Sequence, residues 1–542
     1  MPSVCRANKR LLILAVCSAS WLAAASANQT VAADIIGTKE PFASKAVYFV
    51  VTDRFVDGDP SNNQEEQGGE YPTFNRPIVN NGQAVANLGY MGGDFKGIVN
   101  NADYIAEMGF GAVWGTPVID NPDQAFSGGF ALGEGWFTDK GKTGYHGYWG
   151  VNFYELDEHL PSPGLNFTQF THALDQAGLD FVLDIVGNHG SPSFDMPEDQ
   201  PKFGEIYDQD GVLLADHKNT YPEELDMSDP LSAFFHPSQD IAQLSNFNEN
   251  NPAVVEYLIG SYLHWLDAGA DAIRIDTIKH VPNHFWKTVT DRVRAKYPDL
   301  FFFAEHWDHN AQAIAQHTFP ENGGISVLDF PGQKAMQAVF GQEQKPMTEL
   351  LSYLHLNDGV YANPYDLMTF YDNHDMPRMN ATDQGFIDAH NWLFTSRGIP
   401  VVYYGSETGF RRGRAEHAGN RDYYGQDRVD AGTEHPIRQA LIKIAAARKA
   451  SVALQRGVQR NGDFGVNTAA FVREYQDTRF NETALVLLNK GDTSEMVSIY
   501  VPHSGRYKNL ITGEMKGLVQ GDWSSEVPAH GVQVWNRVQP FD

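Results

Sequence analysis

The feature that most constrains this chain is a repeated alternation of short apolar strands with longer helical segments. Segments such as 98–108, 253–266, 284–295 and 386–396 have helical spacing, and the first stops at Gly109, as a helix C-terminus should. Eight strands with intervening helices favour a closed parallel (β/α)8 barrel, a TIM barrel, over a doubly wound sheet. The predicted strands, rich in β-branched and aromatic residues, are 45–55, 112–118, 181–185, 272–275, 300–304, 326–330, 367–371 and 400–404.

Two regions depart from this alternation. Residues 190–250 are rich in Asp, Pro, Ser and Asn, and a loop of that length is usually functional, often a small inserted domain. After a helix at 437–454 the pattern changes to short strands with turns, for example 495–501. We therefore expect a barrel over 34–456, interrupted after its third strand by this insertion, and a C-terminal all-β sandwich over 457–542.

The first residues, 1–33, have the pattern of a secretory signal peptide. A basic start precedes an uncharged stretch, 11–31, which opens with an apolar run and ends in small residues, including an Ala-Ser-Ala site. The alternatives are a membrane anchor, for which the strongly apolar part is short, and a lipoprotein through Cys17, for which Val16 is a poor fit. Cys5 and Cys17 both lie here, so the mature chain would have no disulfide and bound ions become more attractive as stabilisers.

The net charge and the composition limit the classes of binding partner that this chain can have. The chain has 68 Asp and Glu against 40 Lys and Arg, a formal net charge of −28, which repels nucleic acid and anionic lipid. A hydrophobic fraction of 42% rules out a disordered chain. Neither nucleic acid nor, after signal cleavage, a membrane is therefore an expected partner. We expect a secreted monomer, extracellular or periplasmic.

Acidic residues gather where the predicted strands end, which in such a barrel is the face that carries reacting groups. A single acidic residue there could be a helix cap, but a series of four with His, Arg or Asn nearby is hard to explain in that way. Arg274 and Asp276 are two apart and point to the same side of a strand, so the guanidinium would keep this carboxylate ionised, as a nucleophile requires. Paired carboxylates in an aromatic-rich, secreted protein suggest glycoside cleavage. The four acidic residues are Asp184, Asp276, Glu305 and Asp375.

These four segments resemble the signature regions of the alpha-amylase family, glycoside hydrolase family 13, in order and at fitting separations. Residues 110–117 (FGAVWGTP) and 398–407 (GIPVVYYGSE) are similar to two further segments of the family. The resemblance covers roughly residues 45–540 and is closest to the cyclodextrin glucanotransferase-like alpha-amylases. It implies a catalytic barrel, a domain inserted after strand three and a C-terminal β-sandwich.

The resemblance implies a role for each matching residue. Asp276 looks like the nucleophile of a retaining mechanism, Glu305 like the general acid/base, and Asp375 like the third carboxylate, which orients and distorts the sugar. Six further residues are expected to serve the substrate. Arg274 would hold Asp276 ionised, and Tyr148 of a YHGYW element would stack on the sugar. His189 and His374 would form hydrogen bonds with the sugar hydroxyls, and Lys279 and His280 resemble the pair that lines the acceptor side. For the aromatic residues, core packing is the alternative.

Calcium is the implied cofactor, at one or two sites. The better-marked site resembles a calcium loop of the cyclodextrin glucanotransferases, and closely spaced Asp and Asn on a turn supply the oxygen ligands that a hard cation needs. An ordinary Asx-rich turn is the alternative. The implied ligands are the side chains of Asp57, Asp59, Asn62, Asn63 and Asp94 and the carbonyl of Gly92.

The second site resembles the structural calcium site of the family. It would use Asn188, the backbone carbonyl of His280 and usually an Asp where this chain has Asn246. An amide oxygen can bind calcium, but the site would have one less negative charge and bind more weakly. A fourth ligand has no evident counterpart, and loop polarity is the alternative reading of the asparagines.

The choice between hydrolase and transferase depends on the insertion, which looks more like the cyclodextrin glucanotransferases than like other amylases. Those enzymes use a bulky Tyr or Phe in mid-cleft, where an ungapped match puts Ala242, and they usually carry starch-binding domains absent from this sequence. Both departures favour a secreted retaining endo-hydrolase of α-1,4-glucosidic bonds in starch and maltooligosaccharides. The alternatives are an α-glucan transglycosylase or cyclodextrin glucanotransferase, a cyclodextrin or maltogenic hydrolase and, from another class, an inactive sugar-binding barrel, which the presence of all three carboxylates disfavours.

Overall fold

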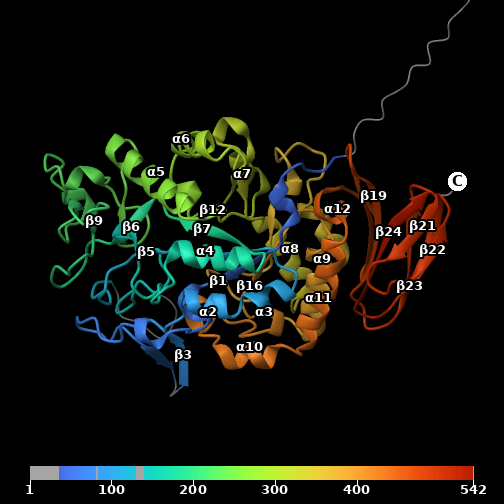
Figure 1. The fold of residues 1–542 in the computed structure, drawn as a ribbon, viewed down its shortest axis with the longest axis horizontal. Coiled ribbons are helices and arrows are strands. Elements are labelled where there is room, and N and C mark those ends of the chain that lie inside the picture. The colour runs from blue at the N-terminus through green and yellow to red at the C-terminus, as the bar shows by residue number, and fades with distance from the viewer. Residues whose placement is uncertain (1–35, 81–82, 130–138, 541–542) are drawn as a thin grey trace, which may run out of the picture. The chain divides into compact units, whose positions relative to one another are not determined.

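The computed structural model describes residues 36–80, 83–129 and 139–540 (Figure 1). The predicted signal peptide and both cysteines lie outside this part of the chain. Within it, every helix is too short or too polar to cross a membrane.

Eight parallel strands form the centre of the fold, in the order β14-β13-β12-β7-β4-β1-β16-β15. The two ends of this sheet meet at a parallel bridge between Leu328, just after β14, and Met368 in β15, so the sheet closes into the predicted (β/α)8 barrel. The strands are β1 (Val47–Val50), β4 (Ala112–Gly115), β7 (Asp180–Ile185), β12 (Ala272–Ile275), β13 (Phe301–Ala304), β14 (Ser326–Val327), β15 (Met368–Thr369) and β16 (Ile399–Tyr403).

Helices follow the strands around the barrel. Most predicted helices are present with boundaries shifted by a few residues, whereas the segments 98–108 and 437–454 each form two helices in place of one. The helices are α1 (Thr52–Phe55), α2 (Phe95–Asn100), α3 (Ala102–Glu107), α4 (Phe167–Gln176), α5 (Pro252–Asp267), α6 (Asn283–Lys296), α7 (Ala311–Ala315), α8 (Phe330–Phe340), α9 (Asp383–Leu393), α10 (Gln426–Gly432), α11 (Pro436–Lys449) and α12 (Val452–Arg456).

Four strands are clearly shorter than predicted, those expected at 45–55, 112–118, 326–330 and 367–371, and the first and third show a physical reason. The segment 45–55 leaves the sheet after Val50, because α1 begins at Thr52. The segment 326–330 stops after two strand residues, because Asp329 caps α8 and accepts a hydrogen bond from the amide of Gly332 at 3.1 Å. In both places a buried helix start continues the apolar run, and apolarity alone does not distinguish it from a strand.

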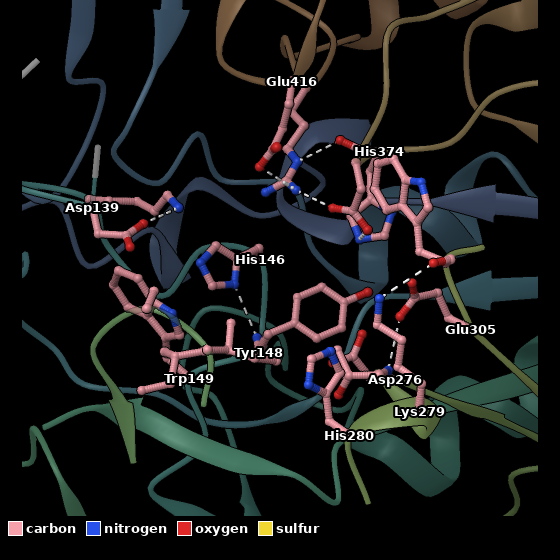
Figure 2. Close-up of a pocket in the computed structure, with 18 residues that line it drawn as sticks. Asp139, His146, Tyr148, Trp149, Asp276, Lys279, His280, Glu305, His374 and Glu416 are labelled. Carbon is pink, nitrogen blue, oxygen red and sulfur yellow. Dashed lines mark hydrogen bonds and ion pairs between the residues drawn. The ribbon is translucent and has the colours of Figure 1, made fainter. Parts of the chain in front are cut away.

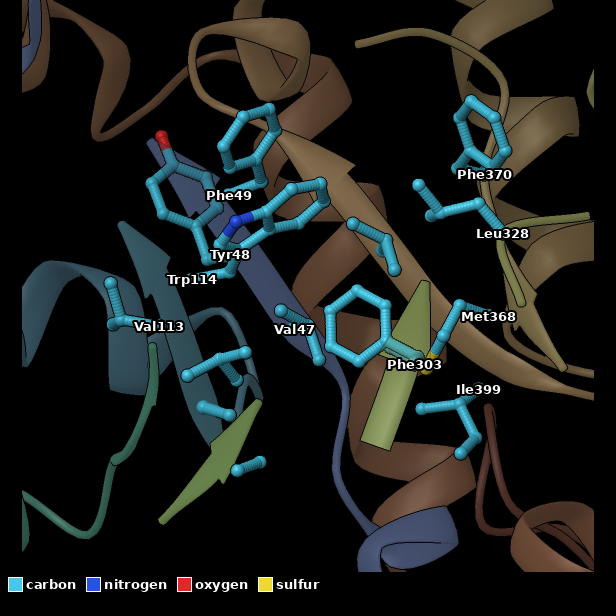
Figure 3. Close-up of a cluster of buried hydrophobic side chains, with 14 of the residues drawn as sticks. Val47, Tyr48, Phe49, Val113, Trp114, Phe303, Leu328, Met368, Phe370 and Ile399 are labelled. Atoms are coloured by element: carbon cyan, nitrogen blue, oxygen red, sulfur yellow. The ribbon is translucent and has the colours of Figure 1, made fainter. Parts of the chain in front are cut away.

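The barrel is filled by large aromatic side chains from neighbouring strands (Figure 3). Phe49 stacks on Trp114 with ring centroids 3.7 Å apart, and Trp114 meets Phe303 edge to face at 5.5 Å. All three are at most 1% exposed. This packed interior fixes the strand ends, and with them the loops that carry the charged residues.

The segment between β7 and α5 holds the predicted insertion. It contains β8 (His189–Pro192), β9 (Glu205–Tyr207), β10 (Leu213–Asp216) and β11 (Leu244–Asn246). Strand β9 pairs with β6 (Asn152–Leu156), which continues to β5 (Ile119–Asp120), so the insertion shares a sheet with the loop after the second barrel strand. The β11–β8 pair returns the chain to the barrel beside the strand end at Ile185.

The C-terminal region is all β, as predicted, and is coloured red in Figure 1. Its strands form one sheet of six and one of two, with a separate buried apolar cluster between them. Arg473 ties it to the barrel, because its buried guanidinium donates to the carbonyls of Thr395 and Ser396 at 2.7 and 2.6 Å. The strands are β17 (Val458–Phe464), β18 (Thr468–Gln476), β19 (Asn481–Asn489), β20 (Glu495–Val501), β21 (Gly505–Asn509), β22 (Met515–Leu518), β23 (Gly521–Val527) and β24 (Gly531–Pro540).

One further antiparallel pair of strands lies between the first and second barrel strands. It consists of β2 (Pro77–Asn80) and β3 (Gln83–Asn87).

Candidate active site

A cleft of about 390 Å³ opens at the carboxyl ends of the barrel strands (Figure 2). All three predicted catalytic carboxylates line it, together with four of the six predicted substrate residues. In Figure 2 the ring of Tyr148 extends across the cleft towards the side that carries Asp276 and Glu305. The predicted residues that line it are Asp276, Glu305, Asp375, Tyr148, Lys279, His280 and His374.

Arg274 lies beneath the cleft and joins its carboxylates. Its Nη1 is 2.8 Å from both Asp184 Oδ1 and Asp276 Oδ1, and its Nη2 is 3.9 Å from Glu305 Oε2. Burial opposes the charge of Arg274, but the surrounding acids outweigh it and raise its pKa well above the ordinary value. Asp276 therefore has a permanent cation in contact with one oxygen while the other part of the carboxylate faces the cleft.

Glu305 has a different environment from Asp276, although both follow adjacent strands. Its Oε2 accepts the backbone amide of Thr277 at 3.0 Å, an arrangement in which Thr277 adopts the left-handed φ of 46°. Burial and the negative charge of Asp276 raise the pKa of Glu305 to about 7. The two neighbouring carboxyls therefore have different environments, since Glu305 retains its proton to higher pH while Asp276 has the Arg274 guanidinium against one oxygen, which is the pattern of an acid paired with a nucleophile.

Asp375 is held from the opposite side by a second arginine. Arg421 Nη2 is 2.5 Å from Asp375 Oδ1 and 2.8 Å from Glu416 Oε1, and its Nε donates to the carbonyl of His374 at 2.9 Å. Burial raises the pKa of Asp375, but His374 and Arg421 outweigh burial and leave the pKa below its ordinary value. This third carboxylate therefore stays ionised.

The remaining predicted substrate residues have well-defined positions. The Tyr148 hydroxyl donates to Asp184 Oδ2 at 2.9 Å, and its ring stacks on His374 with centroids 5.6 Å apart. Lys279 Nζ donates to the carbonyl of Trp307 at 3.4 Å. His189 is 3% exposed and does not line the cleft. Burial lowers the pKa of His189, and the nearby charge of Asp276 opposes this effect.

Several cleft residues were missed by sequence reasoning. Arg421 and Glu416 follow the last barrel strand in a loop without periodicity, and only the fold brings them to Asp375. Trp307 stands two residues after Glu305, and its side chain is 39% exposed. An aromatic residue so close to a predicted strand end could have been found in the sequence, but the prediction at strand ends considered charged residues only. Ala242 also lines the cleft, where the ungapped match puts it, and the lining residues that were not predicted are Asp139, Lys142, His146, Trp149, Ile241, Leu244 and Thr277.

The predicted calcium loop contains the feature that a cation site requires. Asp57 Oδ1, Asn62 Oδ1 and Asn63 Oδ1 are all buried and lack a hydrogen-bond partner within the described part of the chain. Gly92 has φ of 86°, and a Cβ there would lie 2.6 Å from Asn63 Oδ1, so only glycine leaves this oxygen its space. Three orphaned oxygens are costly unless a cation satisfies them, and the residues fit calcium.

The other two side chains of this loop are already engaged. Asp94 Oδ1 accepts the amides of Gly58 and Gly97 at 3.0 and 2.6 Å, and burial raises the pKa of Asp94 to about 6. Asp59 caps the short helix Pro60–Asn62 by accepting from Ser61, and its second oxygen lies 3.4 Å from Lys96 Nζ. A bound cation would favour the ionised form of Asp94.

The second predicted calcium site is organised around a residue that sequence reasoning missed. Asp240 accepts a hydrogen bond from Asn188 Nδ2 at 2.9 Å, and its other oxygen is 3.1 Å from His280 Nδ1. Asn246 instead donates to the carbonyl of Ser238 at 3.3 Å. Asp240 thus supplies here the negative charge that Asn246 lacks, but the described residues show no orphaned buried oxygen at this place.

Two overlapping acidic groups near the insertion have ligand atoms close enough to hold a metal ion. They are Asp120, Asp123 and Glu158, and Asp157, Glu158 and His159. Lys202 Nζ already lies 3.4 Å from Asp120 and 3.0 Å from Asp123, so a side-chain cation balances part of this charge.

The calcium loop yields a stability test. In the presence of excess calcium the wild-type protein should unfold at a higher temperature than after treatment with EGTA. At a calcium concentration of 100 times Kd, ligand linkage raises the free energy of unfolding by about 2.7 kcal/mol. Asp57→Ala should abolish most of this difference, while Asp210→Ala, at an exposed turn away from the loop, should keep it. Scanning calorimetry measures both, and an unchanged calcium effect in Asp57→Ala would place the ion elsewhere.

Comparison with known proteins agrees with this geometry. Residues 49–442 match the family model described as the alpha amylase catalytic domain. The chain is 29% identical over 533 residues to the cyclomaltodextrin glucanotransferase of Klebsiella oxytoca, covering 89% of this chain and 76% of that enzyme. It is 27% identical over 532 residues to an alpha-amylase of Niallia circulans, covering 94% of each.

A solved structure of similar sequence has the same fold. CldA, described as the first cyclomaltodextrin glucanotransferase with a three-domain ABC distribution, superposes with a TM-score of 0.72 at 27% identity, over 91% of this chain and 99% of CldA. Several other curated glucanotransferases are longer, and the chain spans 64% to 69% of their length. Because the family model matches most of its residues, the chain belongs to the alpha-amylase family of glycoside hydrolases.

Proposed function

We propose that this protein is a retaining endo-hydrolase of α-1,4-glucosidic bonds in starch and maltooligosaccharides. The observation that carries the proposal is the pair Asp276 and Glu305, which share one buried arginine but differ in their second partner. An ionised carboxylate beside a protonated one is what glycosidic cleavage with a covalent intermediate requires. An inactive sugar-binding barrel would not need this arrangement.

In the first half of the reaction, Glu305 donates its proton to the glycosidic oxygen as the bond to the anomeric carbon breaks. Asp276 attacks that carbon and forms a glycosyl ester, and the leaving chain departs with a free hydroxyl. The pKa of about 7 means that near pH 7 a substantial fraction of Glu305 carries the proton it must give. Arg274 Nη1, 2.8 Å from Asp276, stabilises the negative charge that this carboxylate carries before it attacks and regains when the ester breaks.

In the second half, Glu305 is a carboxylate and takes a proton from an incoming water. The water oxygen bonds to the anomeric carbon, the ester to Asp276 breaks, and both carboxyls return to their starting states. Asp375, held by Arg421, is placed to bind sugar hydroxyls and to favour the distorted ring. Tyr148 supplies an apolar face for that sugar.

Water rather than a sugar is proposed as the acceptor because the cleft wall is small where a transferase has a bulky ring. Ala242 lines the cleft, next to Ile241 and Leu244. A glucan cannot wrap around a methyl group, so cyclisation would lack a template. The alternative, a glucanotransferase, is favoured by the names of most of the relatives, and product analysis separates the two.

We further propose that the loop of Asp57 holds a structural calcium ion and that the protein is secreted as a monomer. The orphaned oxygens of this loop support the ion, and the basic and apolar pattern of residues 1–33 supports secretion. When bound, the ion would supply the charge that satisfies these oxygens. No catalytic step depends on it.

The assignment of Glu305 is tested by a substrate that needs no acid. Glu305→Gln should lower kcat/KM on amylose by about 10²- to 10⁴-fold, whereas the glycosylation step on α-maltotriosyl fluoride should persist, because fluoride leaves without a proton. Reducing-sugar release measures the reaction on amylose, and the initial burst of fluoride release, before hydrolysis of the ester limits turnover, measures the glycosylation step on the fluoride. Glu321→Gln, at an exposed site away from the cleft, is the control and should leave both unchanged.

The pH profile gives the same assignment a second reading. Because the protonated form is the active one, wild-type kcat/KM on amylose should fall as the pH rises through about 7.

Two results of the mutant experiment would show that another group is the acid. One is near-normal cleavage of amylose by Glu305→Gln, and the other is an equal loss of the glycosylation step on amylose and on the fluoride.

Ala242 provides the test of hydrolysis against transfer. The wild-type protein should release mainly linear products from starch, and Ala242→Tyr should raise the proportion of cyclic and transfer products, because the ring excludes water and templates the chain. Ala242→Gly is the matched control, since glycine accepts the φ of 44° found there and adds no surface. Chromatography of the products measures the ratio, and mainly cyclic products from the wild type would favour the transferase.

A further inference from the structure

A second cavity lies at the barrel face opposite the catalytic cleft. Its volume is about 260 Å³, and the last turn of α11 closes one side of it. The barrel strands begin at this face, which in such barrels contributes to stability rather than to catalysis. Its walls include residues just before β1, β4 and β7, namely 44–46, 109–111 and Gly178, and we call this cavity the amino-end pocket.

The amino-end pocket is basic, although the chain as a whole has a net charge of −28. Lys45, Arg448 and Lys449 line it, and among its described lining residues there is no Asp or Glu. Lys45 has a carboxylate outside the pocket, because its Nζ lies 2.8 Å from Asp180 Oδ1. Lys449 is exposed and forms no ion pair within the described part of the chain. The pocket therefore concentrates positive charge on a protein that is otherwise acidic.

Arg448 is buried in the wall of this pocket without a carboxylate partner among the described residues. The side chain is 2% exposed, and its Nη atoms donate only to backbone carbonyls, among them those of Leu454 and Gly398, each at 2.9 Å. Its Nε is buried and has no hydrogen-bond partner in the described part of the chain. Burial, followed by the charge of Arg473, lowers the pKa of Arg448 to about 9, so the group is still charged at neutral pH. A buried charge and donor of this kind are costly unless a counterion satisfies them.

The pocket has the space for such a counterion. A water needs only about 10–15 Å³ of cavity volume, so 260 Å³ admits a small polyatomic anion together with several waters. Gly111 contributes to this shape, because a Cβ there would lie 2.8 Å from Lys45 Cδ. Only glycine thus lets the stem of Lys45 lie against this wall.

We propose that the amino-end pocket binds a tetrahedral oxyanion of the sulfate or phosphate class, which accepts a hydrogen bond from Arg448 Nε and pairs with Lys449. An ion with four oxygens can accept from donors on separate segments at once, and hydrogen bonds to an ionised acceptor are the strong ones. The bound ion neutralises the buried guanidinium and holds α11 to the segment before β1, which stabilises the barrel. The site is independent of the proposed glycoside chemistry, because it lies at the opposite face.

The first experiment measures sulfate binding by titration calorimetry and thermal unfolding, at constant ionic strength against sodium chloride. Sulfate is the probe because phosphate would also bind calcium. The wild type should bind one sulfate and unfold at a higher temperature in its presence. Lys449→Glu should weaken binding by about tenfold or more, because its carboxylate repels the anion and pairs with Arg448 instead. Lys443→Glu, the same charge reversal at an exposed position of α11 outside the pocket, should bind sulfate like the wild type.

The second experiment locates the ion. Crystals grown in chloride and soaked with selenate, a sulfate analogue, should show an anomalous selenium peak within hydrogen-bond distance of Arg448 Nε, and no such peak in Lys449→Glu.

Three results would overturn the proposal: no sulfate binding by the wild type, an equal response to sulfate in the wild type and Lys449→Glu, or selenate bound only elsewhere. Cleavage of amylose should be the same in the wild type and both lysine variants. A wild type that does not cleave amylose would contradict the proposed function and leave the result for the anion unchanged.

Discussion

The buried guanidinium of Arg274 is the interaction on which the rest of the site depends. It touches Asp184 and Asp276 at 2.8 Å and approaches Glu305, so one positive charge serves three carboxyls without access to solvent. Removing a partner from such a buried set typically costs about 3–5 kcal/mol, because the remaining charge stays buried and unpaired. Asp184 therefore has a structural reason to be present: its second oxygen accepts hydrogen bonds from Trp114 Nε1 and the Tyr148 hydroxyl, which links the charge to the barrel core and to the wall of the cleft.

The barrel makes this arrangement possible by placing three neighbouring strands side by side. The parallel register of β7 and β12 puts Asp184 opposite Arg274. Further along, Ile275 of β12 is opposite Ala304 of β13, so Asp276 and Glu305 follow at the next level, just beyond the carboxyl ends of the two strands. The opposite wall is built differently, since Asp375 and its partner Arg421 belong to loops after the last two strands. Each wall thus has its own buried arginine, which is shared by more than one carboxyl, and the cleft lies between the two ion-paired clusters.

Much of this could be predicted from the sequence, for a physical reason. Barrel strands buried on both faces are continuous apolar runs, so the segment 272–275 matches the observed strand residue for residue, and a charged residue just after such a run lies at the carboxyl face. In the C-terminal region the segment 495–501 also matches its strand, because its burial alternates from residue to residue. Loop contacts have no such periodicity. Asp240 reaches Asn188 and His280 across the insertion, and Glu416 meets Arg421 beside Asp375, through turns whose paths the sequence does not reveal.

The most direct test of the account is to identify the residue that becomes covalently linked to sugar. With the Glu305→Gln protein and α-maltotriosyl fluoride, formation of the ester needs no acid while its hydrolysis lacks a base, so the glycosyl-enzyme should accumulate. Mass spectrometry of peptides from the quenched reaction should find the maltotriosyl group on Asp276, and on no peptide after Asp276→Asn. An adduct on another residue, or a product of inverted configuration formed without any adduct, would contradict the mechanism and the role assigned to Arg274.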